Sequence, residues 1–351
     1  MLRHYDPICG PLILWGPPGC GKTAAVSSYA KRYGWHLEVI GVATRQPEDF
    51  LGMPYRSNDG MVFDPPAWAK RAAKAEKALI FFDELSCAKS SVQAAVLKVI
   101  DERLVGEFRL PPTVWMVAAA NPPDQAAEGF EMKLPLANRF RHRFVKEDPE
   151  DFTRNFPSYW DDPPEIAGLS EETWAQVRAK VAGFIHSNPA TLLIIPKDGT
   201  LAWPSPRTWD KASRVLAACN LNIKDAEEGI TECVGVDAAS AFIRWLTMAE
   251  LPTPEECVAD PAKINTKRGD IVFTCLSSIF QKAKTDKTFW NKSWNVLTHV
   301  AEHGWEDLAV RFASDMAKTG TQQGWMVSGA SAKGVQTLLE KAKKLEEGLV
   351  K

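Results

Sequence analysis

The segment GPPGCGKT at residues 16–23 constrains the fold of this chain more than any other feature. It matches the phosphate-binding pattern G-x-x-x-x-G-K-[ST] and follows the apolar run LILWG at residues 12–16. Its glycines allow a tight turn in which successive backbone N–H groups face a polyphosphate. A helix that begins near Lys22 would add the positive end of its dipole. The pattern therefore predicts a strand, a phosphate-binding loop and a helix, in that order.

The end of this segment is suited to a triphosphate and its metal ion. The Lys22 ammonium would reach the β- and γ-phosphates, and the Thr23 hydroxyl would bind Mg²⁺, which keeps several waters and takes few protein ligands. Cys20 is interpreted as a small residue of the loop, and we also weigh a reactive thiolate favoured by the helix N-terminus, whose oxidation would block nucleotide binding. The expected nucleotide-binding residues are Gly16, Pro17, Pro18, Gly19, Cys20, Gly21, Lys22, Thr23, Ala24 and Asp83.

Short apolar runs alternate with amphipathic stretches through the first 150 residues. Several runs are apolar throughout, as is typical of strands buried on both faces. This alternation predicts a parallel sheet with helices on both of its faces. The runs are LILWG (12–16), HLEVIGV (36–42), ALIFFDE (78–84), TVWMVAAAN (113–121) and HRFVK (142–146).

Two of these runs end in polar residues that suit phosphoryl transfer. Ligands of such sheets bind beyond the carboxyl ends of the strands, where Asp83, Glu84 and Asn121 are expected. Asp83 would bind the metal ion and Glu84 would orient the attacking water or accept its proton. Asn121 would contact the water or the γ-phosphate without adding charge. An ordinary Asn-Pro turn is the alternative for this last residue.

The composition changes near residue 150. Residues 155–168, NFPSYWDDPPEIAG, indicate a linker, and Ser170 is a plausible N-cap for the helix that follows. The rest of the chain is expected to be mostly helical. The expected helices cover 208–219, 237–250, 270–284, 293–303 and 332–348.

The overall composition excludes several classes of protein. The 351 residues are 45% apolar and 25% charged, which argues against a disordered chain. A formal net charge of −2 argues against a basic nucleic-acid coat protein. We find no apolar run long enough to span a bilayer and no signal-peptide pattern at the N-terminus. The seven cysteines form no C-x-x-C pair and are expected to be reduced, so we expect a cytoplasmic protein without a membrane partner.

In their order, these motifs resemble the AAA+ ATPases and, within them, the MoxR family. The similarity covers about residues 8–250. It is carried by GPPGCGKT (16–23), EDFLGMPYRSNDGMVFDPPAWAKRA (48–72), LIFFDEL (79–85), DERLVGEF (101–108), AAANPP (118–123), LPLANRF (134–140) and WPSPRTW (203–209).

The resemblance implies an α/β fold, an αβα AAA+ core with a parallel sheet, followed by an all-helical lid. We therefore expect the core over residues 1–154, a linker and lid over 155–250, and a helical C-terminal extension over 251–351. It also implies hydrolysis of ATP to ADP and phosphate with Mg²⁺, in a homo-oligomeric ring that is usually a hexamer. The ring would remodel a protein client, as a chaperone does, often with a partner that carries a von Willebrand factor A domain.

The family's functional residues carry over onto matching positions. Lys22 and Thr23 match the Walker A pair, and Asp83 and Glu84 match Walker B. Asn121 matches sensor 1. Two arginines complete the set: Arg139 matches the arginine finger and Arg207, in Ser-Pro-Arg, matches sensor 2.

The arginine finger also has a physical basis. A guanidinium supplied in trans stabilises the charge on the transferred phosphoryl group, an effect of about 10³–10⁵ in rate. Asn138 replaces the family's usual Asp beside Arg139, so any salt bridge that would orient the finger is in question. Arg141 and Arg143 are the alternative fingers, and ordinary surface or interface cations are the alternative for all three.

Two glycine-bearing segments are expected to form hairpins that touch a client. They are residues 52–63, where family members insert a hairpin and a pore loop, and residues 103–110 around Gly106. Surface hairpins without a partner are the alternative.

Two other functions are weighed. A nucleic-acid motor or loader of the AAA+ class would use RFRHRF (139–144) and the hairpins to grip phosphates, and the near-zero net charge disfavours it. A zinc peptidase would use His299 and His303 of HVAEH (299–303), one helical turn apart, and would need a third ligand such as Glu306. Ordinary helix histidines are the favoured interpretation of that pattern.

Overall fold

The computed structural model describes residues 9–58, 60–122, 132–161, 165–196, 199–326 and 335–341. The chain divides into two compact units, Met1–Glu147 and Asp148–Lys351. The first unit thus ends seven residues before the expected boundary at 154, and the expected lid and extension lie together in the second unit. None of the described helices is long and apolar enough to cross a membrane.

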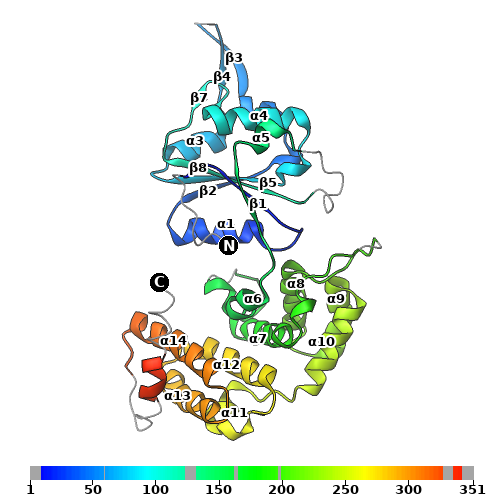
Figure 1. The fold of residues 1–351 in the computed structure, drawn as a ribbon, viewed down its shortest axis with the longest axis vertical. Helices are drawn as coiled ribbons and strands as arrows, with labels where there is room; N and C mark the ends of the chain where they lie inside the picture. The colour runs from blue at the N-terminus through cyan, green and yellow to red at the C-terminus, as the bar shows by residue number, and fades with distance from the viewer. Residues whose placement is uncertain are drawn as a thin grey trace. The chain divides into compact units, whose positions relative to one another are not determined.

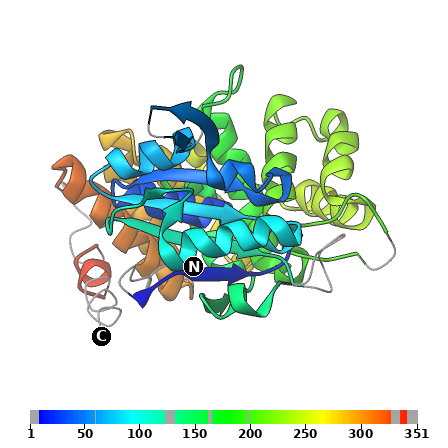
Figure 2. The ribbon, with the colours of Figure 1, turned by 90° about the horizontal axis from the view of Figure 1, so that it is seen from above.

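The first unit is built on a five-stranded sheet in the order β2-β5-β8-β1-β9, and all its pairings are parallel. Helix α1 lies on one face of the sheet and α3 and α4 on the other (Figure 1); Figure 2 views the ribbon from above, with helices overlying the strands. The expected αβα architecture is confirmed.

The strands are β1 (Leu12–Trp15), β2 (His36–Gly41), β5 (Ala78–Asp83), β8 (Val114–Ala120) and β9 (Arg141–Phe144). The helices are α1 (Lys22–Arg32), α2 (Glu48–Leu51), α3 (Ala67–Lys74), α4 (Ser90–Glu102) and α5 (Leu134–Ala137), with short 3₁₀ turns at Val42–Thr44 and Leu85–Cys87.

Alternate residues of the central strands enter two separate apolar cores. Ile80 and Phe82 of β5 pack into the core on the α3–α4 side, and Leu79 and Phe81 pack into the core on the α1 side. All four side chains are fully buried. Burial on both faces explains why β5 is an unbroken apolar run rather than an alternating one.

Two antiparallel hairpins leave the sheet. Strands β3 (Met53–Ser57) and β4 (Gly60–Asp64) form one, and β6 (Leu104–Val105) and β7 (Phe108–Arg109) form the other, so both expected hairpins are present. Gly106, at the β6–β7 turn, has φ +61° and donates its N–H to Phe50 O at 3.1 Å. A Cβ at this position would lie 2.1 Å from Leu51 O.

The second unit is helical. Its α-helices are α6 (Pro149–Asn155), α7 (Glu171–Ser187), α8 (Pro206–Ala218), α9 (Ile223–Val234), α10 (Val236–Met248), α11 (Pro254–Ala259), α12 (Gly269–Ala283), α13 (Lys287–Glu302) and α14 (Glu306–Gln323). Short 3₁₀ helices cover Phe156–Asp161, Pro189–Thr191 and Pro261–Lys263, and residues 335–341 are also helical. The remainder of the expected tail helix 332–348 falls outside the described residues.

Helix α7 belongs to two cores at once. Val181 and Phe184 pack with α8–α10, while Ala182 packs with the core of α11–α14. Helix α7 packs closely against α12 at Gly183. A Cβ at this position would lie 1.8 Å from Thr274 Oγ1, so only glycine allows this approach. Packing of this kind joins the expected lid to the expected extension.

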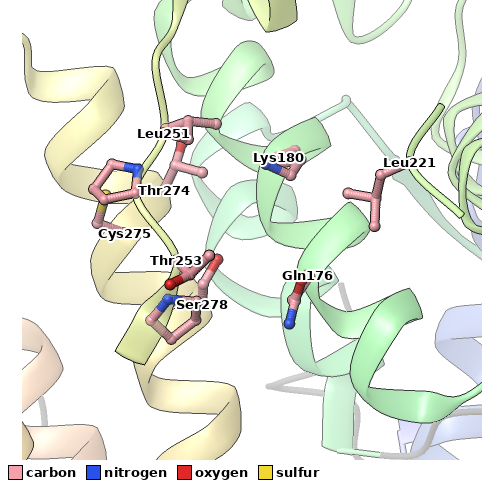
Figure 3. Close-up of a pocket in the computed structure, with 10 residues that line it drawn as sticks. Gln176, Lys180, Leu221, Leu251, Thr253, Thr274, Cys275 and Ser278 are labelled. Carbon is pink, nitrogen blue, oxygen red and sulfur yellow. The ribbon is translucent and has the colours of Figure 1, made fainter. Parts of the chain in front are cut away.

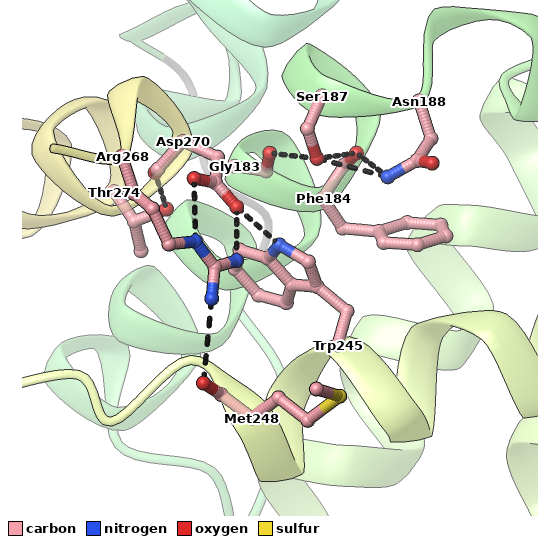
Figure 4. A network of polar contacts seen from close by, with 9 residues as sticks. All are labelled: Gly183, Phe184, Ser187, Asn188, Trp245, Met248, Arg268, Asp270 and Thr274. Carbon is pink, nitrogen blue, oxygen red and sulfur yellow. Dashed lines mark hydrogen bonds and ion pairs between the residues drawn. The ribbon is translucent and has the colours of Figure 1, made fainter.

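A polar network ties the end of α10 to the start of α12 (Figure 4). Asp270 accepts a bond from Trp245 Nε1 at 2.7 Å and pairs with Arg268 at 2.6 Å. Arg268 also donates to Met248 O at 3.3 Å. This network explains why residues on both sides of position 250 form one compact unit.

Candidate nucleotide-binding site

Strand order brings three strand ends of the first unit together. Because β8 lies between β1 and β5, the residues that follow these strands meet at one edge of the sheet. Trp15 pairs with Ala120, and Phe82 with Ala118. The glycine loop, the Asp83–Glu84 pair and Asn121 are therefore neighbours, as the sequence predicts.

The glycine loop has the backbone geometry that its sequence predicts. Gly19 and Gly21 adopt φ of +80° and +93°, and Gly21 is the N-cap of α1. Gly16 donates its N–H to Ala120 O at 3.2 Å. A Cβ on Gly16 would lie 3.0 Å from Val145 O, so the loop is also packed tightly from behind.

Lys22 is buried at the centre of the site. Its ammonium donates to Gly16 O at 2.7 Å, Pro17 O at 3.0 Å and Asn121 Oδ1 at 2.9 Å. The lysine thus links the glycine loop to the residue after β8. A positive charge fixed at the N-terminus of a helix suits a polyphosphate.

Thr23 and Asp83 supply two adjacent oxygen ligands. The Thr23 hydroxyl donates to Asp83 Oδ2 at 2.7 Å, and Asp83 Oδ1 accepts the Glu84 N–H at 3.0 Å. A hydroxyl and a carboxylate are hard donors that fit Mg²⁺, which takes its remaining ligands from phosphates and water. The donor set therefore fits the expected magnesium ion.

Glu84 has an unusual backbone for a glutamate. Its φ of 58° and ψ of 37° are left-handed, and the 3₁₀ turn Leu85–Cys87 starts immediately after it. The side chain is exposed, and no hydrogen bond of its carboxylate is found among the described residues. Strained backbone of this kind is often found at functional sites. Glu84 is thus free to face a substrate.

Ser86 is a member of the site that the sequence interpretation missed. Its buried hydroxyl accepts the Asn121 N–H at 3.1 Å and so fixes the end of β8 against the end of β5. A serine after Asp-Glu-Leu carries no distinctive signal, because its role depends on how two strands meet.

The reactive-thiolate hypothesis for Cys20 is not supported. Burial raises the pKa of the Cys20 thiol, and the nearby Lys22 ammonium only partly opposes this effect. The buried thiol is therefore neutral at physiological pH, which fits the interpretation of Cys20 as a small loop residue.

Arg139 pairs with an acid that the sequence did not suggest. Its Nε and Nη2 atoms donate to Asp101 Oδ1 and Oδ2 at 3.0 and 2.9 Å. Of the alternative fingers, Arg141 lies on β9 and donates to Gly10 O at 3.2 Å, and Arg143 lies two residues further along the strand. Arg207 is exposed near the start of α8 in the second unit. Its sensor role stays a prediction.

The HVAEH pattern does not gather ligands in the described part of the chain. The rings of His299 and His303 lie 4.1 Å apart, but His303 Nδ1 contacts the backbone carbonyl of His299. Glu306, the expected third ligand, pairs with Lys341. No group of three or more His, Cys, Asp or Glu side chains that could hold a metal occurs among the described residues. Ordinary helix histidines fit this geometry.

Residues 11–140 match the family model of an AAA domain of the dynein-related subfamily. MoxR of Methylorubrum extorquens is 29% identical over 146 residues, which are 40% of this chain and 42% of that protein. Midasin of Giardia intestinalis is 28% identical over 143 residues, which are 38% of this chain and 3% of that protein. The chain therefore spans less than half of either relative. Among solved structures, the RuvB Holliday junction branch migration motor of Thermotoga maritima has a TM-score of 0.35 and 11% identity, over 69% of this chain and 63% of that one.

Proposed function

We propose that the chain is a MoxR-like AAA+ ATPase through its N-terminal unit, and that it hydrolyses ATP with Mg²⁺ to drive the remodelling of a protein client; the match of residues 11–140 to an AAA domain and the similarity to MoxR support this. The observation that carries the proposal is the convergence of Lys22, Asn121 and the Thr23–Asp83 pair at one sheet edge. These groups come from three strand ends. A cation, an amide and a hydroxyl–carboxylate pair are the parts that transfer of a phosphoryl group requires.

Each residue has a distinct role in the proposal. Lys22 and the N–H groups of the glycine loop bind the phosphates, and Thr23 and Asp83 bind Mg²⁺, which neutralises charge on the transferred group. Glu84 orients the attacking water and accepts its proton. Asn121 detects the γ-phosphate through its contact with Lys22.

Arg139 would complete the site of a neighbouring copy in a ring. The side chain is exposed, and its planar guanidinium is already oriented by two bonds to Asp101. Orientation before binding reduces the entropy that is lost when the arginine meets a phosphate. Arg207 would act as the lid's own sensor of the γ-phosphate.

The β3–β4 hairpin is the best candidate for contact with a client. Met53 and Met61 are 71% and 65% exposed, and Tyr55 is 50% exposed. The cross-strand pairs Tyr55–Val62 and Arg56–Met61 place apolar groups on both faces of the hairpin. Flexible methionine and aromatic side chains adapt to varied apolar segments. A partner with a von Willebrand factor A domain, as the family resemblance implies, would present the client.

Mixing of two inactive variants tests the proposal. Arg139→Ala subunits keep an intact pocket, and Lys22→Ala subunits keep an intact finger. Mixed rings should regain ATPase activity, because some sites combine the pocket of one variant with the finger of the other. Each variant alone should be inactive.

A second experiment separates nucleotide binding from the action of Arg139 on a neighbouring subunit. Binding of a fluorescent ATP analogue with Mg²⁺ should persist in Arg139→Ala and be lost in Lys22→Ala. Failure of the wild-type chain to bind the analogue would overturn the proposal as a whole. Activity that does not recover on mixing, with binding intact, would overturn only the action of Arg139 in trans.

A further inference from the structure

A cavity of about 240 Å³ opens inside the second unit between α7, α12 and the turn that leads into α11 (Figure 3). Its apolar wall includes Leu221, Leu251 and Pro254. This volume exceeds the roughly 30 Å³ that one water occupies in the liquid, so the space can hold a small organic molecule.

Three polar side chains that line this cavity make no hydrogen bond or ion pair with any other described residue. They are Gln176 and Lys180 of α7 and Ser278 of α12. Together they offer an amide, an ammonium group and a hydroxyl, all of which can donate. None of the three is fully buried, so their polar atoms are available to a ligand or to solvent in the cavity.

Lys180 differs from the other cations of the same helices. Lys282, on the same helix as Ser278, pairs with Glu172 and Glu255, and Arg178 of α7 pairs with Glu171. No carboxylate lines the cavity around Lys180. A largely buried ammonium without a counter-charge is unfavourable.

Neighbouring groups do not supply the missing negative charge. Burial lowers the pKa of the Lys180 ammonium, and the Cys275 thiol is the group that opposes this change. However, a hydrogen bond with Cys257, together with burial, strongly raises the pKa of Cys275, so this thiol stays neutral. Thr274, also at the cavity, already donates its hydroxyl to Asp270 O at 2.7 Å.

We propose that this cavity binds a free monocarboxylic acid with a short aliphatic chain, whose carboxylate contacts Lys180, Gln176 and Ser278. One cation and two neutral donors match the single charge and two oxygens of a carboxylate. The leucine and proline wall matches a short aliphatic chain. A phosphate dianion fits less well, because Lys180 is the one cation among the described residues that line the cavity.

Titration of the full chain with isotope-labelled butyrate, followed by NMR of the labelled ligand, tests the proposal. Binding should be saturable, stronger for butyrate than for acetate, and absent for inorganic phosphate. Lys180→Met should weaken butyrate binding by about tenfold or more, as expected when a hydrogen bond to a charged group is lost. Lys282→Met is the matched control and should bind as the wild type does.

Protection of the wild-type amine gives a readout that needs no variant. Acylation of Lys180 by an amine-reactive ester, followed by mass spectrometry, should slow when butyrate is present, while acylation of Lys282 should not. Absence of saturable butyrate binding, a preference for phosphate, unchanged affinity in a folded Lys180→Met variant, or equal acylation with and without butyrate would each overturn the proposal.

Discussion

Arg139 and Asp101 form a two-point ion pair that connects the turn after α5 to the last turn of α4. The neighbour of Arg139 in the sequence, Asn138, is not the residue that orients it. Both oxygens of Asp101 are engaged, so the plane of the guanidinium is fixed as well as its position. A salt bridge that Asn138 cannot form is thus supplied by Asp101, 38 positions earlier in the chain, and the finger role of Arg139 stays a prediction.

Asp101→Asn should therefore lower ATP turnover in the assembled protein by about tenfold to a hundredfold, because a misplaced group loses much of its effect on rate. Nucleotide affinity should not change, since Asp101 contacts no residue of the glycine loop. Steady-state kinetics would show a fall in kcat with KM unchanged. The neighbouring exposed carboxylate gives a matched control, Glu102→Gln, which should behave as the wild type. Wild-type turnover in Asp101→Asn would contradict a positioning role.

Glu84→Gln should retain ATP binding and lose hydrolysis by about 10²–10⁴-fold, the usual contribution of a general base. The amide keeps the size of the side chain but accepts no proton. Single-turnover hydrolysis and equilibrium binding of ATP would separate the two effects. Glu107→Gln, at the β6–β7 hairpin, should leave both unchanged. Hydrolysis at the normal rate in Glu84→Gln would assign the base elsewhere.

Glu38 should make the first unit sensitive to acid. Burial raises the pKa of this carboxyl, but bonds from Arg71 at 2.7 Å and His36 at 2.6 Å more than offset the effect, and the pKa falls below its ordinary 4.5. A carboxyl with a lowered pKa in the folded state stabilises the protein above the unfolded pKa, and this stabilisation is lost as pH falls.

Glu38→Gln should therefore lower Tm by a few degrees near neutral pH, and the difference from the wild type should shrink below pH 4.5. Thermal melts from about pH 7 to about pH 3.5 would measure it. Glu48→Gln, on the exposed start of α2, is the control. A difference in Tm that does not depend on pH would argue against the ion pair.

Gly106→Ala should destabilise the first unit more than Gly34→Ala does. Both glycines have left-handed φ, +61° and +65°, so each alanine carries a backbone cost of about 1–2 kcal/mol. A Cβ on Gly106 would also collide with Leu51 O, whereas nothing lies within 4 Å of one on Gly34. Chemical denaturation should show an additional loss of about 1–3 kcal/mol for Gly106→Ala. Equal losses of unfolding free energy in the two variants would show that the β6–β7 hairpin shifts away from Leu51 without an energetic cost.

The sequence predicted the geometry of this sheet edge well, because the signals there are local. Gly19 and Gly21 serve a backbone turn that few other residues can adopt, and β5 is apolar throughout because both of its faces are buried. The contact between Thr23 and Asp83 lies at the carboxyl ends of parallel strands, and the alternation of strands and helices already implies that the strands are parallel.

Contacts between distant segments could not be predicted in the same way. The hydrogen bonds from Arg139 to Asp101 and from Asn121 to Ser86 depend on the positions that turns take in the folded structure, and the local sequence does not determine these positions. The favoured interpretation of Cys20, a small loop residue, fits the structure, while the thiolate alternative failed because the effect of burial on its pKa cannot be predicted from one loop. The predicted boundary between lid and extension at residue 250 marks where the family resemblance ends. In the structure a hydrogen bond from Trp245 to Asp270 connects the segments on either side of this boundary.

The shared helix α7 has a mechanical consequence. With Gly183 packed against Thr274, and Phe184 packed into the core of α8–α10, the helices on either side of α7 have little freedom to slide past each other. A movement of α8 would therefore be transmitted through α7 to α12. If the chain hydrolyses ATP as proposed, spin labels on α8 and α14 should keep one separation with and without nucleotide, because the second unit would move as a rigid body.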